Sequence, residues 1–144
     1  GLHMKPSPFE EIRGPENKIL WSNKLNNQKG IQALKRKDAD ILNAMLQEAV
    51  KNGTGSAADL QTRPVAGKTG TSEGGRDLWF IGSIPQLTTG IWFGYDNNNK
   101  TSSGSGEAAL AWKKYMQKID HDMAVVKFPN RPFSSPSIKS MFGE

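Results

Sequence analysis

The chain has 144 residues, of which 35% are hydrophobic, with 15 glycines and 8 prolines. This length suits one ordinary domain, and the composition indicates a globular piece with many turns rather than a disordered chain. Nineteen basic and 14 acidic residues give a formal charge of +5. The basic residues are dispersed, and the one tight run, Lys35-Arg36-Lys37, has no aromatic residues among it, so we expect no nucleic-acid partner.

Cysteine is absent, which excludes a disulfide, a thiolate metal site and a cysteine nucleophile. His3 and His121 stand far apart in the sequence, so we expect no metal site and no cofactor. No stretch is apolar enough to span a bilayer, and no charged-then-apolar leader opens the chain. We therefore expect any exporting or anchoring segment of a parent protein to lie outside this chain.

Residues 1–36 predict an N-terminal hairpin followed by a connection. Residues 9–12 and 18–21 are extended in character, and Gly14-Pro15-Glu16-Asn17 between them is typical of a turn. Residues 23–30 are polar and continue the chain as a connection.

Apolar residues at helical spacing predict the first helix. They are Ile41, Leu42, Met45, Leu46, Ala49 and Val50. Asp38 or Asp40 is suited to cap its start, and Asn52-Gly53 is suited to end it with a left-handed residue. Residues 54–58 then read as a loop.

Residues 64–72, 77–84 and 88–95 predict three strands. Their short connections require antiparallel pairing of neighbours, because a parallel crossover needs a dozen or more residues. Since aromatic residues dominate cores, four aromatic residues are expected in the core rather than at a substrate site. They are Trp79, Phe80, Trp92 and Trp112. For Asp77 we expect a solvated carboxylate at a loop end.

Residues 107–119 predict a second amphipathic helix that packs on one face of the sheet. The fold class is therefore α+β, an antiparallel sheet with flanking helices. Residues 120–144, rich in proline and serine, are expected to form an extended tail.

The stretch Ala66-Gly67-Lys68-Thr69-Gly70-Thr71 contains a Lys-Thr-Gly-Thr motif, which is one of three signatures of penicillin-reactive serine enzymes. The other two, Ser-x-x-Lys and Ser-x-Asn, are absent from the sequence. A phosphate-binding loop is a poor alternative, because it requires glycine where Thr62 stands and must open a helix. The sequence therefore indicates that the chain forms part of an active site and lacks the nucleophile.

Four further stretches accompany the motif in order. They are residues 50–55, residues 77–82 with Pro85, residues 91–96, and Ala109 with Trp112. On these motifs, residues 37–119 resemble the C-terminal part of the transpeptidase domain of penicillin-binding proteins, most closely the bifunctional class A peptidoglycan synthases. The resemblance implies an incomplete portion of the penicillin-binding/serine β-lactamase-like transpeptidase fold. It also implies a parent D,D-transpeptidase of the cell envelope, anchored in the membrane outside this chain.

The same resemblance implies roles for the motif residues. Lys68 would face the missing Ser-x-Asn serine and add positive potential near the substrate carboxylate. The Thr69 and Thr71 hydroxyls would hydrogen-bond that carboxylate or the peptide, and the Thr71 N–H would be one oxyanion donor. Gly67 and Gly70 would let the substrate backbone lie along the strand edge. Strict alternation places Lys68 and Thr71 on opposite faces, so a shared cleft requires the strand to twist, bulge or end near Gly70.

The implied partners are peptidoglycan stem peptides, β-lactams and the remainder of the transpeptidase domain. An exposed sheet edge and an uncovered helix stripe would make the isolated chain prone to self-association. Two alternatives stay open: a non-catalytic peptide-binding module that retains the motif strand, and a serine β-lactamase-like fragment. The chain alone is expected to be inactive.

Overall fold

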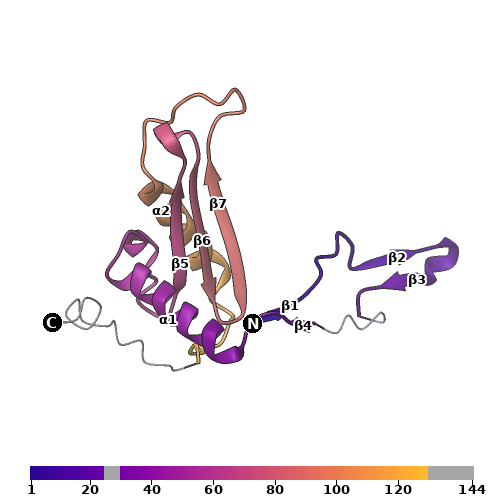
Figure 1. Cartoon of the computed structure of the whole chain (residues 1–144). Coiled ribbons are helices and arrows are strands. Elements are labelled where there is room, and N and C mark those ends of the chain that lie inside the picture. Colours follow the sequence, from indigo (N-terminus) through magenta and orange to yellow (C-terminus); the bar gives the residue numbers. More distant parts are fainter. Residues whose placement is uncertain (25–29, 130–144) are drawn as a thin grey trace. The chain divides into compact units, whose positions relative to one another are not determined.

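The computed structural model describes residues 1–24 and 30–129. By its internal contacts the chain divides into two compact units, Gly1–Ala39 and Asp40–Glu144, and each is described by itself. Figure 1 shows the elements of both units. Within the described residues, no helix combines the length and apolar character that crossing a membrane requires.

The first unit contains the predicted hairpin. β2 (Glu11–Arg13) pairs antiparallel with β3 (Ile19–Ser22) around a 3-10 turn at Pro15–Asn17, which confirms the hairpin. A further antiparallel pair joins β1 (Leu2–His3) to β4 (Ile31–Gln32). Each of these strands has two residues, so no alternating pattern in the sequence could predict them. The middle of the predicted connection, residues 25–29, lies outside the described residues.

The first predicted helix is present as α1 (Arg36–Lys51), but both of its predicted ends are wrong. It begins before Asp38, which therefore lies in the first turn, and Asp40 is buried inside the helix. At the other end neither Asn52 nor Gly53 has a positive φ angle. The helix is closed instead by the Gly55 N–H, which donates to the Ala49 carbonyl at 2.9 Å, and a 3-10 turn (Ser56–Ala58) follows.

Three antiparallel strands in the described part of the second unit form its sheet, as predicted. β5 (Ala66–Thr71), β6 (Leu78–Ile84) and β7 (Leu87–Phe93) lie in the order β5-β6-β7. The turn between β5 and β6 contains Gly74 and Gly75 with φ of 73° and 66°, a conformation that favours glycine. β5 and β7 are thus the two outer strands of this sheet (Figure 1).

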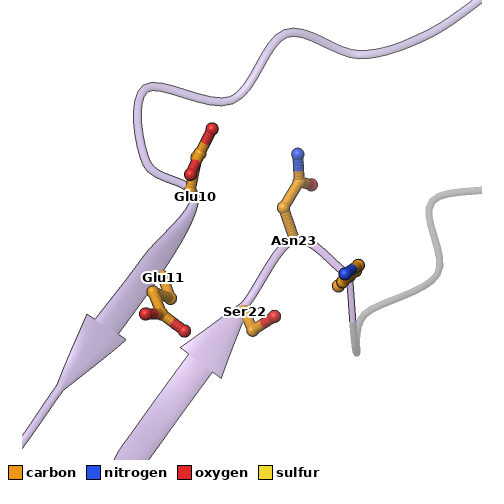
Figure 2. Close-up of a pocket in the computed structure, with 5 residues that line it drawn as sticks. Glu10, Glu11, Ser22 and Asn23 are labelled. Atoms are coloured by element: carbon orange, nitrogen blue, oxygen red, sulfur yellow. The ribbon is translucent and has the colours of Figure 1, made fainter.

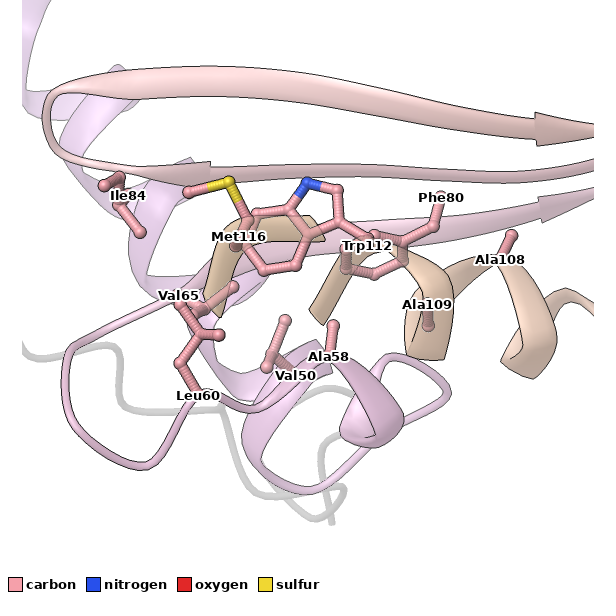
Figure 3. Packing of buried hydrophobic residues seen from close by; sticks show 10 residues of the cluster. All are labelled: Val50, Ala58, Leu60, Val65, Phe80, Ile84, Ala108, Ala109, Trp112 and Met116. Atoms are coloured by element: carbon pink, nitrogen blue, oxygen red, sulfur yellow. The ribbon is translucent and has the colours of Figure 1, made fainter. Parts of the chain in front are cut away.

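α2 (Ser105–Ile119) covers one face of the sheet and closes the core (Figure 3). The Trp112 ring packs edge-on against Phe80, with ring centroids 5.4 Å apart. Both side chains are fully buried, as predicted for them. Further residues of this cluster come from the end of α1, the 3-10 turn, the loop that follows it, β6 and α2: Val50, Ala58, Leu60, Val65, Ile84, Ala108, Ala109 and Met116.

The other two aromatic residues predicted for the core are exposed. Trp79 and Ile81 alternate with the buried residues of β6, and Trp92 lies opposite Trp79 on β7. Their exposed fractions are 43%, 53% and 40%. These side chains therefore lie on the sheet face opposite α2, and this apolar face has no cover among the described residues of the unit.

Gly82 provides the space into which Trp112 packs. A Cβ atom at this position would lie 2.6 Å from Trp112 Cε2 and 2.6 Å from Phe80 Cε1. Because two buried rings must shift to admit it, Gly82→Ala is expected to lower the free energy of unfolding by about 1–3 kcal/mol. Urea denaturation of the full-length protein measures this effect. Gly90→Ala is the matched control, because a Cβ there meets nothing closer than 3.7 Å.

A buried ion pair fixes the C-terminal end of α2. The Arg63 guanidinium lies 3.0 Å from the Asp120 carboxylate through Nε, and their side chains are 7% and 11% exposed. Arg63 Nη2 also donates to the carbonyls of Asp120 and Met123 at 3.0 and 2.8 Å. Residues 120–129 contain no helix or strand, and residues 130–144, the rest of the predicted extended tail, lie outside the described part.

Candidate functional site

The predicted motif lies on β5, and half of its backbone groups face away from the rest of the sheet. The Ser72 N–H donates to the Asp77 carbonyl at 3.1 Å, so position 72 bonds toward β6. Because backbone groups alternate in direction along an antiparallel strand, those of Gly67, Thr69 and Thr71 point to the opposite side. In the described part of this unit no strand lies there. Among the described residues of this unit, the motif therefore presents an edge whose peptide groups no neighbouring strand pairs.

Lys68 places its ammonium group at this edge. Its Nζ donates to the Thr69 carbonyl at 3.1 Å and to the Thr69 hydroxyl at 3.3 Å. A third contact, at 3.4 Å, is to the hydroxyl of Thr54. Both the ammonium and the carbonyl it contacts therefore lie where an added strand would bind.

Alternation along β5 places Lys68 and Thr71 on opposite faces of the sheet, and the backbone of β5 is regular there. The register of β5 on β6 is continuous from Ala66 to Thr71, so of the three alternatives, twist, bulge or early end near Gly70, the bulge and the early end do not occur. Thr69 and Thr71 share one face, and Lys68 belongs to the other. The long lysine side chain instead curls over the free edge and reaches the Thr69 hydroxyl.

The two motif glycines differ in their surroundings. Gly67 is buried, and a Cβ there would lie 2.5 Å from Phe80 Cζ, so its small size serves core packing rather than substrate access. At Gly70 a Cβ would meet only Trp79 Cβ, at 3.4 Å. Unlike Gly67, Gly70 therefore has room for a small side chain.

Asp77 is not the solvated carboxylate that was predicted. Its two oxygens accept hydrogen bonds from the Ser72 hydroxyl at 2.9 Å and from Trp92 Nε1 at 3.0 Å. The Asp77 N–H in turn donates to the Ser72 hydroxyl at 2.9 Å. This network joins the residue after Thr71 to β7 and thereby fixes the end of the motif strand.

Thr54 is a site residue that the sequence reasoning missed. Its hydroxyl lies 2.7 Å from the Thr69 hydroxyl, although 15 residues separate them. The tight exit of α1 brings it there: Gly55 is buried against the Ala49 carbonyl, Val50 and Phe80, where a Cβ would lie within 3.4 Å of each. The signal in the sequence was the glycine on either side of Thr54.

A hollow in the first unit lacks the features of this site. Figure 2 shows the side chains of Glu10, Glu11, Ser22 and Asn23 around it, at the open end of the hairpin. Its one hydroxyl belongs to Ser22, which is buried and is followed three positions later by leucine rather than lysine. Although Ser22 and Lys24 both line the hollow, they lack the Ser-x-x-Lys spacing, so the hollow is not a candidate nucleophile site.

Comparisons with known proteins identify the family and agree with the fold. A family described as the penicillin-binding protein transpeptidase domain matches residues 1–123. The matched span is wider than residues 37–119, on which the resemblance rests. The chain belongs to this family.

Relatives with curated names match most of the chain. Penicillin-binding protein 1A of Clostridium acetobutylicum is 32% identical over 126 residues, which is 87% of this chain and 15% of that protein. Penicillin-binding protein 1A of Aquifex aeolicus is 32% identical over 139 residues, 94% of this chain and 18% of that protein. The chain thus spans less than a fifth of the length of these relatives.

Two solved structures are also similar. Penicillin-binding protein 1A from Haemophilus influenzae aligns with a TM-score of 0.68 and 20% identity, covering 95% of this chain and 26% of that one. The D,D-transpeptidase domain of a peptidoglycan glycosyltransferase from Eggerthella lenta aligns with a TM-score of 0.56 and 26% identity, covering 76% and 26%. The fold is therefore an incomplete portion of the transpeptidase fold, as expected.

Proposed function

We propose that this chain supplies the lysine-bearing wall of the active site of a peptidoglycan D,D-transpeptidase. The observation that carries the proposal is the open edge of β5, where the Lys68 ammonium, the Thr69 hydroxyl and outward peptide groups lie together. Residues 37–119 form this portion of the domain, with residues 1–36 before it and 120–144 as a tail. A stem peptide ending in D-Ala-D-Ala, or a β-lactam, adds to the edge as an extra strand.

Each motif residue has a role in acyl transfer. Lys68 adds positive potential near the terminal carboxylate, and Thr69 and Thr71 donate hydrogen bonds to it. The Thr71 N–H, which faces the open edge by alternation along β5, stabilises the oxyanion. Gly70 leaves room for the ligand backbone.

The nucleophile comes from the remainder of the domain. Its serine attacks the carbonyl of the penultimate D-alanine, the bond to the terminal D-alanine breaks, and an acyl-enzyme forms. An acceptor amine then takes the acyl group and frees the serine. The chain alone, without Ser-x-x-Lys, is inactive.

The remainder of the domain is also the partner of the apolar sheet face around Trp79, Ile81 and Trp92. Separated from it, the chain leaves this face, both outer strand edges and the α1 residues Ile41, Leu42 and Met45 exposed. Such surfaces favour self-association of the isolated chain. The protein acts outside the cytoplasm at the cell envelope, held by a membrane anchor beyond these residues.

Incubation with benzylpenicillin followed by intact mass measurement tests the proposal. The full-length protein that carries this chain is expected to gain one penicilloyl group, and the 144-residue chain none. A full-length protein without an adduct would contradict the transpeptidase role. If it still bound stem peptide, the non-catalytic binding module would be favoured. Rapid loss of the adduct with release of penicilloic acid would favour the β-lactamase-like alternative.

A further inference from the structure

The motif strand has a hydrogen-bond partner outside the motif. Thr54 contacts both the Thr69 hydroxyl, at 2.7 Å, and the Lys68 ammonium, at 3.4 Å. Lys68 also contacts the Thr69 hydroxyl, at 3.3 Å, so the three polar groups form a closed triangle. All three residues belong to the second unit.

The donors and acceptors of this triangle can be counted. An ammonium group only donates, whereas a hydroxyl has one proton to donate and two lone pairs that accept. When Thr54 donates to Thr69, the Thr69 oxygen accepts from Thr54 and from Lys68, and both of its lone pairs are used. The Thr69 hydroxyl can then make one more hydrogen bond, through its own proton. In this state Thr69 offers a donor to a ligand and no acceptor.

We propose that Thr54 is a positioning residue that makes Thr69 a donor for the ligand's carboxylate. The inference rests on the proposed function, since it concerns the same ligand. A carboxylate accepts the Thr69 proton and thereby selects the arrangement in which Thr54 donates to Thr69. A ligand group that itself needs an acceptor, such as an amide N–H or an ammonium, finds none on this hydroxyl. Thr54 thus favours an anionic ligand terminus without touching it.

The test uses the full-length protein and its rate constant of acylation by benzylpenicillin. Thr54→Val removes the hydroxyl at nearly constant shape and is expected to slow acylation about tenfold, the effect of one hydrogen bond. Thr54→Ser retains the hydroxyl and is expected to restore at least half of the rate. Thr88→Val is the matched control, because it breaks another hydroxyl pair of the sheet, Ser83 with Thr88 at 2.8 Å, outside the motif.

A double-mutant cycle with Thr69→Val tests whether Thr54 acts through Thr69. A direct contact of Thr54 with the ligand, or a general effect on folding, would not depend on the Thr69 hydroxyl. In the Thr69→Val background, Thr54→Val is expected to change the rate by less than twofold. Benzylpenicillin methyl ester keeps only a neutral carbonyl acceptor in place of the carboxylate, so Thr54→Val is expected to slow acylation by the ester less than acylation by benzylpenicillin.

Three outcomes would overturn the inference: an unchanged rate for Thr54→Val, fully additive effects of the two substitutions, or an equal loss with the methyl ester. Failure of the proposed function is distinguishable from all three, because the unaltered protein would then not be acylated at all.

Discussion

Lys68→Ala in the full-length protein is expected to slow acylation by benzylpenicillin by about 10²–10³-fold. The substitution removes a cationic group that lies among the motif hydroxyls, with Nζ 3.1 Å from the Thr69 carbonyl. Removal of one positioned donor from the active site of other acyl-transfer enzymes costs about this much. Lys68→Arg keeps the charge but replaces a compact ammonium with a planar fork, so we expect it to restore the rate only in part.

Two controls separate chemistry from folding in this prediction. The Lys68 side chain is exposed, so its removal is expected to leave the melting temperature within about 2 °C of the unaltered protein. Lys114→Ala, on the exposed surface of α2, removes the same charge elsewhere and should leave the rate unchanged. A Lys68→Ala protein that is acylated at the normal rate would contradict the role assigned to this lysine.

Asp120→Ala is expected to lower the free energy of unfolding by about 3–5 kcal/mol. It leaves the Arg63 guanidinium buried without its carboxylate, and breaking one side of a buried pair has this cost. The loss should appear in urea denaturation of the full-length protein. It should also lower acylation when the protein is warmed, because α2 packs on the sheet that carries the motif.

Two further variants test whether the unpaired Arg63 charge causes this loss of stability. Arg63→Met with Asp120→Leu replaces both charges by apolar side chains and is expected to recover at least half of the lost stability. His121→Ala, which removes the neighbouring exposed pair with Asp122, is expected to change stability by less than 0.5 kcal/mol. A stability loss for Asp120→Ala as small as that of His121→Ala would contradict the structural role of the buried pair.

The main sheet is predictable from the sequence because its connections are short. Residues 72–77 and 85–86 are too few for a parallel crossover, so antiparallel neighbours are required. The helix ends are less predictable, since α1 begins two residues before Asp38 and ends through Gly55. Caps depend on the local path of the chain, and several residues here suit the same role.

The candidate site is predictable only where its residues are adjacent in sequence. Lys68 to Thr71 form one motif, but the contact of Lys68 with Thr69 depends on a flexible side chain crossing the strand edge. Thr54 joins the site through the fold of the α1 exit, which spacing alone does not reveal.

The burial prediction failed for two aromatic residues, Trp79 and Trp92, for a different reason. Trp79 and Phe80 are adjacent on β6 and point to opposite faces, and composition does not say which face α2 covers. The same holds for Trp92, whose indole N–H donates to Asp77 at 3.0 Å. An aromatic-rich segment therefore predicts a strand more securely than it predicts burial.

A crystal structure of the full-length protein acylated by benzylpenicillin tests the central claim most directly. The claim predicts a penicilloyl serine outside these 144 residues, with its carbonyl oxygen accepting from the Thr71 N–H and its carboxylate bonded to Thr69 and Thr71. Lys68 should lie beside that carboxylate. An adduct on a residue of this chain, or a ligand bound away from the edge of β5, would contradict the account.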